Sequence, residues 1–282
     1  AMGSGITTFR RVPEAISSLV PILGILALIV FACIIFGDKY HIDPWLDKNA
    51  VATDRVLNYK KGFLNPVFFL VWPIFTLCTW SFVGWKMRQL SRETDERPLS
   101  ENQARQFTWK NTIWGSVYIV FFALTVGSSI PWLWLMSIDA HWFSTMYSWY
   151  TFGSTFVSGI ALMGLFVIYL KNQGYLEYTN DEHLHDIGKF IFAFSIFWTY
   201  LWFAQFMLIW YANIPEETIY FKARLQGSYR GIFWLNLIVN FVAPILILMT
   251  RGSKRNYTIM TFMCVLILLG HWLDFFQMVM PG

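Results

Sequence analysis

Apolar residues run for long stretches along this chain, and polar residues gather between the stretches. Seven stretches approach or exceed the roughly 20 residues that a helix needs to cross a bilayer core about 30 Å thick. They lie near residues 15–36, 63–85, 112–135, 144–170, 187–211, 231–249 and 257–280. Within lipid, a helix satisfies its own backbone hydrogen bonds. The pattern therefore predicts an all-α, polytopic membrane helix bundle, with about seven transmembrane helices in a single integral membrane domain over residues 1–282.

Composition supports a membrane protein and excludes a nucleic-acid partner. Only 13% of the residues are charged, whereas soluble domains carry about 25%. Aromatic residues make up 20% of the chain, and many Trp and Tyr stand near the ends of the apolar stretches, as expected at a membrane–water interface. The net charge of +4 is small and scattered, so we expect no nucleic acid to bind.

The distribution of lysine and arginine favours an orientation in which the N-terminal end of the chain lies on the cytoplasmic side. With that orientation, the cytoplasmic segments carry 13 of these residues and the opposite segments carry 8. Positive charge is retained preferentially on the cytoplasmic side. The chain begins and ends abruptly, at Ala1–Gly5 and at Met280–Gly282, and we expect further residues beyond both ends.

The sequence predicts no metal or redox cofactor bound by this chain, and no catalytic residue. Cys33, Cys78 and Cys264 lie in apolar stretches without CxxC spacing, which excludes the usual iron–sulfur and zinc patterns. Of the five histidines only His271 lies within a predicted span, so haem b lacks facing ligands. Copper and di-iron sites also lack paired histidines or a Glu-x-x-His motif.

A stripe of hydroxyl groups marks the fourth span. Spacings of three and four residues place its members on one helical face. We include in this stripe Ser144, Tyr147, Ser148, Thr151, Ser154, Thr155 and Ser158. Hydroxyl groups of this kind hold membrane helices together, and they can also line a hydrated proton path. The two interpretations are compatible.

His271 and Asp274 share a face of the seventh span because they are three residues apart. An imidazole and a carboxyl group side by side can share a proton, which suits a relay. The alternative is a structural pair near the outer rim. We expect Asp274 to face the bundle, with His271 and hydroxyls such as Tyr147 or Ser154 around it, since an unpaired carboxylate against lipid is costly.

Two further polar clusters stand at the ends of spans. Asp139 and His141 precede the fourth span, whereas His183, His185 and Asp186 open the fifth. Histidine titrates near neutral pH, so such clusters can collect protons at a channel mouth. The second cluster is also typical of a charged helix cap. We expect it at the cytoplasmic surface, near the inner end of the hydroxyl stripe and on the opposite side from Asp139.

Three motifs resemble the F subunit of bacterial alternative complex III, from the NrfD-like, polysulfide-reductase-type membrane family. They are DAHWFSTMYSWY at 139–150, HLHDIGKF at 183–190 and QFMLIWYANIPEE at 205–217. FRRVPEAI at 9–16 and GHWLD at 270–274 fit the same family. The resemblance covers essentially the whole chain, although the family has about ten spans.

The resemblance implies a subunit of a quinol:cytochrome c, or quinol:electron acceptor, oxidoreductase in the bacterial inner membrane. In that family, electrons from quinol pass to iron–sulfur and haem c subunits, then to cytochrome c or a terminal oxidase. The implied partners are those subunits, a homologous NrfD-like membrane subunit, lipids and quinone. The family's established quinol site belongs to the homologous C subunit, so no quinone-binding residue is assigned here.

Other functions compete with this interpretation. A stand-alone transporter or proton channel would show broken helices and inverted repeats around a site near the membrane midplane, and we find neither pattern in the sequence. A purely structural membrane anchor is the third possibility.

Overall fold

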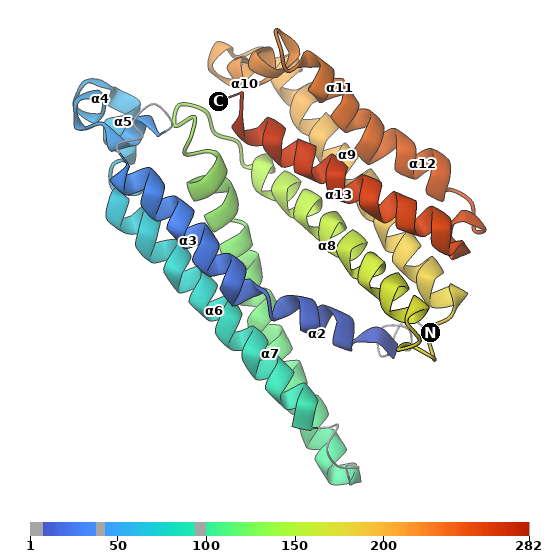
Figure 1. Ribbon diagram of the computed structural model, residues 1–282. Helices are drawn as coiled ribbons and strands as arrows, with labels where there is room; N and C mark the ends of the chain where they lie inside the picture. Colours follow the sequence, from blue (N-terminus) through green and yellow to red (C-terminus); the bar gives the residue numbers. More distant parts are fainter. Residues whose placement is uncertain (1–7, 38–42, 94–99, 282) are drawn as a thin grey trace. The chain divides into compact units, whose positions relative to one another are not determined.

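The computed structural model describes residues 8–37, 43–93 and 100–281 (Figure 1). Over these residues it contains helices and their connections, without a β-strand. Seven of the described helices are long and apolar enough to cross a membrane: Arg11–Phe36, Pro66–Glu93, Glu101–Leu135, Met146–Asn172, Asp181–Ala212, Arg230–Leu248 and Tyr257–Val279. The predicted all-α bundle with seven spans is confirmed, and the chain is a multi-pass membrane protein.

Two helices begin earlier than the apolar stretches predict, because polar residues cap them. α7 (Glu101–Val126) starts at a capping box in which Ser100 and Gln103 bond each other's backbone N–H groups. α9 (Asp181–Ala212) starts in the same way, with Asn180 and His183. Reciprocal caps satisfy N–H groups that have no partner in the first turn. Both helices therefore extend past the apolar stretch into polar surroundings.

The chain divides into two compact units. The hairpin unit comprises Glu14–Ala140, and the bundle unit comprises Ala1–Pro13 together with His141–Gly282.

In the hairpin unit, α6 (Pro66–Glu93) packs against both α3 (Val20–Phe36) and α7. α2 (Arg11–Ser17), of which Glu14–Ser17 belongs to this unit, precedes α3, and the π-helix η2 (Ser129–Leu135) continues α7. Three short elements follow α3: η1 (Pro44–Leu46), α4 (Lys48–Thr53) and α5 (Arg55–Lys60). Their side chains join a buried apolar cluster that includes Trp45, Leu57, Phe69 and Leu133.

Four membrane-crossing segments form the bundle unit. α8 (Met146–Asn172) packs along both α9 and α13 (Tyr257–Val279). The fourth segment is continuous through α11 (Arg230–Leu237), the π-helix η3 (Ile238–Val242) and α12 (Ala243–Leu248). The short helix α10 (Pro215–Leu225) connects α9 to α11 at the end of the bundle where α13 finishes (Figure 1). A last short turn, η4 (Ser253–Arg255), precedes α13 at the opposite end.

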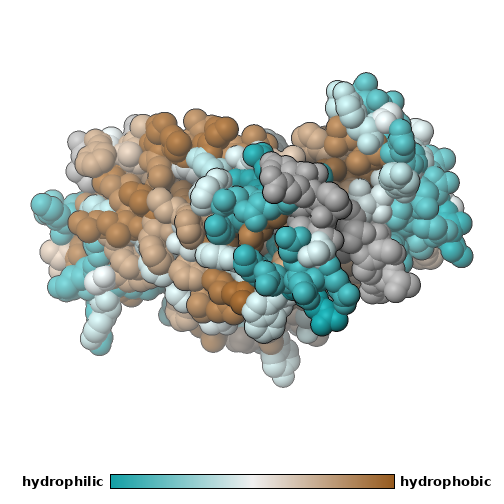
Figure 2. All heavy atoms as spheres, turned by 90° about the horizontal axis from the view of Figure 1, so that it is seen from below, coloured by the Kyte–Doolittle hydropathy of each residue, from teal (hydrophilic) through white to brown (hydrophobic). Residues whose placement is uncertain are grey.

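Much of the surface is apolar, as lipid contact requires. Figure 2 shows broad hydrophobic areas on the face in view, with hydrophilic residues gathered in separate patches. α3 is the extreme case: Ile22, Leu26 and Val30 are all more than half exposed. Side chains of this kind meet acyl chains or another membrane helix without cost, since lipid tails are as apolar as they are.

Candidate functional site

Asp274 lies at the centre of a buried polar cluster in the bundle unit. It belongs to α13 and is only 1% exposed. Its Oδ1 accepts hydrogen bonds from the Tyr150 hydroxyl of α8 and from Asn236 Nδ2 of α11, the latter at 2.8 Å. Its Oδ2 accepts from Trp198 Nε1 of α9 at 2.9 Å. Each of the three neighbouring helices thus supplies one donor to the carboxyl group, which faces the bundle as expected.

His271 extends the cluster by one turn of α13. It is 1% exposed, and its Nδ1 lies 3.8 Å from Asp274 Oδ2. The same nitrogen is 2.9 Å from Ser154 Oγ on α8, and the ring meets the Trp198 indole edge-on. His271 Nε2 has no hydrogen-bond partner among the described residues. Ser154, His271 and Asp274 therefore form a polar series across two helices, hydrogen-bonded between Ser154 and His271.

The segment formed by α11, η3 and α12 contributes two buried asparagines, Asn236 and Asn240, to the cluster. Asn236 Nδ2 also approaches Gln277 Oε1 at 3.4 Å, and Asn240 Nδ2 donates to Asn236 Oδ1 at 2.5 Å. The π-helix η3 begins at Ile238, between the two asparagines. Such π-helical turns are frequent at functional sites because they reorient side chains within a helix.

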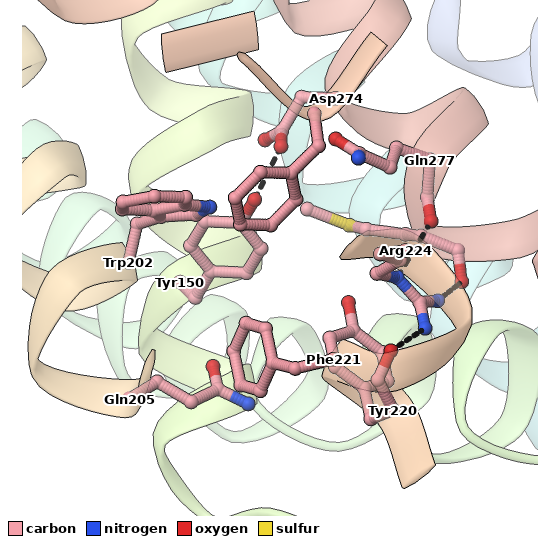
Figure 3. Close-up of a pocket in the computed structure, with 10 residues that line it drawn as sticks. Tyr150, Trp202, Gln205, Tyr220, Phe221, Arg224, Asp274 and Gln277 are labelled. Carbon is pink, nitrogen blue, oxygen red and sulfur yellow. Dashed lines mark hydrogen bonds between the residues drawn. The ribbon is translucent and has the colours of Figure 1, made fainter. Parts of the chain in front are cut away.

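A small cavity adjoins Asp274 on the side of α10 (Figure 3). Its walls include Tyr150, Trp202, Gln205, Tyr220 and Gln277. The space open to the centre of a water molecule is about 10 Å³, which is enough for about one water. The Nε2 atoms of Gln205 and Gln277 have no protein partner among the described residues, so both can bond such a water. The cavity is too small for a quinone ring.

Arg224 closes the cavity at the end of α13 (Figure 3). Its Nε and Nη2 donate to the carbonyl oxygens of Gln277 and Met278, each at 3.0 Å, and its Nη1 donates to the Tyr220 carbonyl at 2.8 Å. The guanidinium also stacks on the Tyr220 ring. A cation there satisfies the last carbonyls of α13 and complements the helix dipole. Burial raises the pKa of the Tyr220 hydroxyl, and Arg224 partly offsets that effect.

The opposite half of the bundle core is mainly apolar, although Ser195 and Lys254 are also buried there. Toward the start of α13, Met260, Met263 and Ile267 are fully buried, as are Val157 on α8 and Ile191 on α9. At 1.5 Å per residue, Asp274 lies about 8 Å of helix from Val279 and about 26 Å from Tyr257. The polar cluster therefore connects with the α10 end of the bundle, while an apolar core separates it from the other end.

The hydroxyl stripe of the fourth span divides into different roles. Thr151 Oγ1 bonds the Ser148 carbonyl and Ser158 Oγ bonds the Ser154 carbonyl, so both groups are used within α8 itself. Tyr147 is hydrogen-bonded to Tyr220 rather than to Asp274. Ser144 lies just before α8 and is half-buried. Among the stripe residues, Ser154 is the one whose hydroxyl contacts His271.

Sequence reasoning missed several side chains of the site, among them Tyr150, Trp198, Asn236 and Arg224. Tyr150 was within reach of the helical argument, because it is three residues after Tyr147 and four before Ser154. The other three lie on different helices, and no local spacing links them to Asp274.

Within the bundle unit, His141 and the His183 cluster lie at opposite ends of α8. His141 precedes α8, whereas His183, His185 and Asp186 open α9, which follows the far end of α8. Ser158, the last residue of the stripe, is about 21 Å of helix from Asn172. The apolar core lies along this interval, so the expected approach of the stripe to the His183 cluster is not seen. Asp139 belongs to the hairpin unit.

The cluster that opens α9 makes caps and surface ion pairs. His183 Nδ1 accepts from the Asn180 backbone N–H at 3.1 Å. Asp186 pairs with Lys189 at 2.7 Å, and His185 lies 4.0 Å from Glu182. These contacts are those of a helix start, where acidic groups complement the dipole. No group of three metal-ligating side chains occurs among residues 8–37, 43–93 and 100–281.

Comparison with known proteins adds no relative to this picture. A scan against protein-family models finds no match for the chain, and a search of curated proteins finds no significant relative.

Proposed function

We propose that this chain is an integral membrane subunit of a quinol-oxidising respiratory oxidoreductase of the alternative complex III type, located in a bacterial inner membrane. Within it, the Asp274 cluster conducts protons. The observation that carries the proposal is a carboxyl group that is 1% exposed, bonded from three other helices and adjacent to a buried histidine. Ionisable groups in a membrane core are costly and therefore mark function.

The motif resemblance supports the same assignment. His271 and Asp274 belong to the GHWLD motif, Tyr150 ends the first long motif, and Gln205 begins the third. These residues are far apart in the sequence, yet Tyr150, Gln205 and Asp274 line one cavity. Motifs that were matched separately thus supply the residues of a single site.

In the proposed path, protons pass between the α10 end of the bundle and His271. A water in the cavity bonds Gln205 and Gln277, and Asp274 exchanges a proton with it. Tyr150, Trp198 and Asn236 hold the carboxyl group in place by donating to it. His271, held by Ser154, takes the proton one step deeper. Quinol oxidation releases protons, so a proton-accepting series beside it has a direct use.

The electron carriers in this proposal belong to partner subunits. Iron–sulfur and haem c subunits accept the electrons, and a homologous NrfD-like subunit holds the quinol. The small volume beside Asp274 supports placing the quinol on that partner. A stand-alone proton channel fits less well, because buried apolar side chains such as Met260, Met263 and Ile267 separate the cluster from the other end of the bundle.

Two measurements test the proposal separately. The first is purification of the chain in mild detergent from its native membrane, followed by identification of co-purifying proteins and a reduced-minus-oxidised absorption spectrum. We expect haem c absorption and an iron–sulfur partner. A chain isolated without redox partners would contradict the assignment to a respiratory complex.

The second measurement uses Asp274→Asn, with Glu177→Gln as a control that removes an exposed carboxylate. The complexes are reconstituted in vesicles and supplied with quinol and an electron acceptor. We expect Asp274→Asn to assemble and to lose proton translocation coupled to electron transfer, while the control retains it. Unchanged coupling in an assembled Asp274→Asn complex would leave Asp274 with a structural role only.

A further inference from the structure

A second pocket lies in the hairpin unit, near the end of α6. It is lined by Ser18, Trp85, Arg88, Gln89, Arg92 and Glu93. The space open to the centre of a water molecule is about 420 Å³, far more than beside Asp274. The pocket occupies the point where α6 passes from apolar to polar residues, which corresponds to the membrane interface.

Two arginines one turn apart dominate the chemistry of this pocket. Arg88 Nη1 donates to Ser17 Oγ at 2.8 Å, which holds the guanidinium in place and leaves its other N–H groups available. Arg92 is exposed and has no hydrogen-bond or ion-pair partner among the described residues. Paired guanidinium groups suit phosphate oxygens because they offer several N–H donors in a planar fork.

The surroundings extend this basic site toward lipid. Trp85 is 53% exposed and forms one wall of the pocket, as an indole does at the headgroup layer. Lys86 lies over the Trp85 ring and bonds Gln89, which adds a third cation. Glu93 is the one acidic residue of the lining, so positive charge prevails. Leu19 and Ile22, which follow Ser18 in the sequence at the start of α3, are exposed and apolar.

We propose that this pocket binds the phosphate headgroup of an anionic phospholipid, whose acyl chains lie along the exposed apolar residues at the start of α3. Charge complementarity and the interfacial position carry this assignment. The predicted orientation places the pocket at the cytoplasmic leaflet, where anionic lipids attract basic residues. The proposal does not depend on the respiratory function.

The test is native mass spectrometry of the full chain, titrated with phosphatidylglycerol and with phosphatidylcholine. We expect preferential retention of phosphatidylglycerol, weakened about fivefold by Arg92→Gln, the effect of removing one cation near an anionic surface. Arg92 has no described partner, so its replacement leaves the fold intact. Arg88→Gln should act similarly. Arg105→Gln, on an exposed pair with Glu101, is the matched control.

A second measurement locates the lipid. Phosphatidylglycerol brominated near its headgroup should quench Trp fluorescence, and Trp85→Phe should remove part of that quenching. Glycerol phosphate should fail to displace the lipid if the acyl chains contribute; displacement would indicate a site for free phosphate and overturn the lipid assignment. Equal retention of phosphatidylglycerol by the wild type and both arginine variants, or its absence in the wild type, would also overturn the proposal.

Discussion

Trp198 and Asp274 are joined by a 2.9 Å hydrogen bond from the indole Nε1 to the carboxyl Oδ2, which connects α9 to α13 inside the bundle. Both residues are buried, at 0% and 1% exposure. Asp274 also accepts from Tyr150 and Asn236. The bond therefore belongs to a network in which the carboxyl group is the common acceptor, and changing either partner affects both.

The first prediction is that Trp198→Phe destabilises the wild-type chain more than it destabilises an Asp274→Asn chain. In the wild type the loss of the donor leaves the buried Asp274 Oδ2 without its hydrogen bond, which costs about 1–3 kcal/mol. An amide at position 274 cannot accept from both Trp198 and Asn236, so one donor is already unpaired there. A double-mutant cycle of unfolding free energies in detergent measures the coupling. Additive effects would show that the bond does not couple the residues.

Gly270→Ala is predicted to destabilise the bundle because α13 contacts η3 closely at this glycine. An added Cβ would lie 2.2 Å from Asn240 Oδ1 and 2.5 Å from Val239 Cγ1, so these side chains or the helices that carry them must shift. Overpacking of this kind costs about 1–3 kcal/mol. Gly159→Ala is the control, since a Cβ there has nothing within 4 Å. Thermal unfolding compares the two; equal melting temperatures would contradict the close approach.

Arg224→Met should lower stability by unpairing the end of α13. The carbonyl oxygens of Gln277 and Met278 lose their donors, and each buried polar group left unpaired costs about 1–3 kcal/mol. Lys222→Met on the same helix is the control because Lys222 is exposed. Hydrogen exchange of the last turn of α13 provides the readout. Protection that stays the same in Arg224→Met would rule out a capping role.

Stability should depend on alkaline pH through Lys60. Its Nζ donates to the Ala140 carbonyl at 2.5 Å, and burial lowers the pKa of Lys60 below the ordinary 10.5, with Asp139 partly offsetting the effect. Between the lowered pKa and 10.5, the unfolded chain holds more protons than the folded one. Stability therefore rises with pH across that window.

Lys60→Met should flatten this rise, since the variant has no titrating group at the position. Denaturant midpoints measured at several pH values up to 10.5 provide the comparison. Lys61→Met, at an exposed neighbouring position, should retain the wild-type slope. An identical slope in Lys60→Met would assign the dependence to other groups.

Much of the fold followed from the order of residues alone. Span number and type were predictable because a bilayer imposes a minimum apolar length on each helix, and that requirement is local in sequence. Helix starts were less predictable. Ser100 and Asn180 extend α7 and α9 beyond their apolar stretches through side-chain caps, which a count of apolar residues does not register.

The candidate site was only partly visible in the sequence. The spacing of His271 and Asp274 identified both residues, because neighbours on one helix face are set by helical periodicity. Their partners depend on how other helices are rotated and aligned against α13. Thus Tyr150 rather than Tyr147 reaches Asp274, and Trp198 and Asn236 join it from helices that carry no local signal.

Sequence by itself determined that this chain is a membrane helix bundle with an acid and a histidine inside one span. Tertiary structure alone decided that Asp274 accepts hydrogen bonds from three other helices and that Arg224 donates to the last carbonyl groups of α13. It also decided that the polar cluster lies toward one end of the bundle. The reason is physical: hydrophobic length and helical period are properties of adjacent residues, whereas hydrogen-bond geometry depends on the packing of segments far apart in the chain.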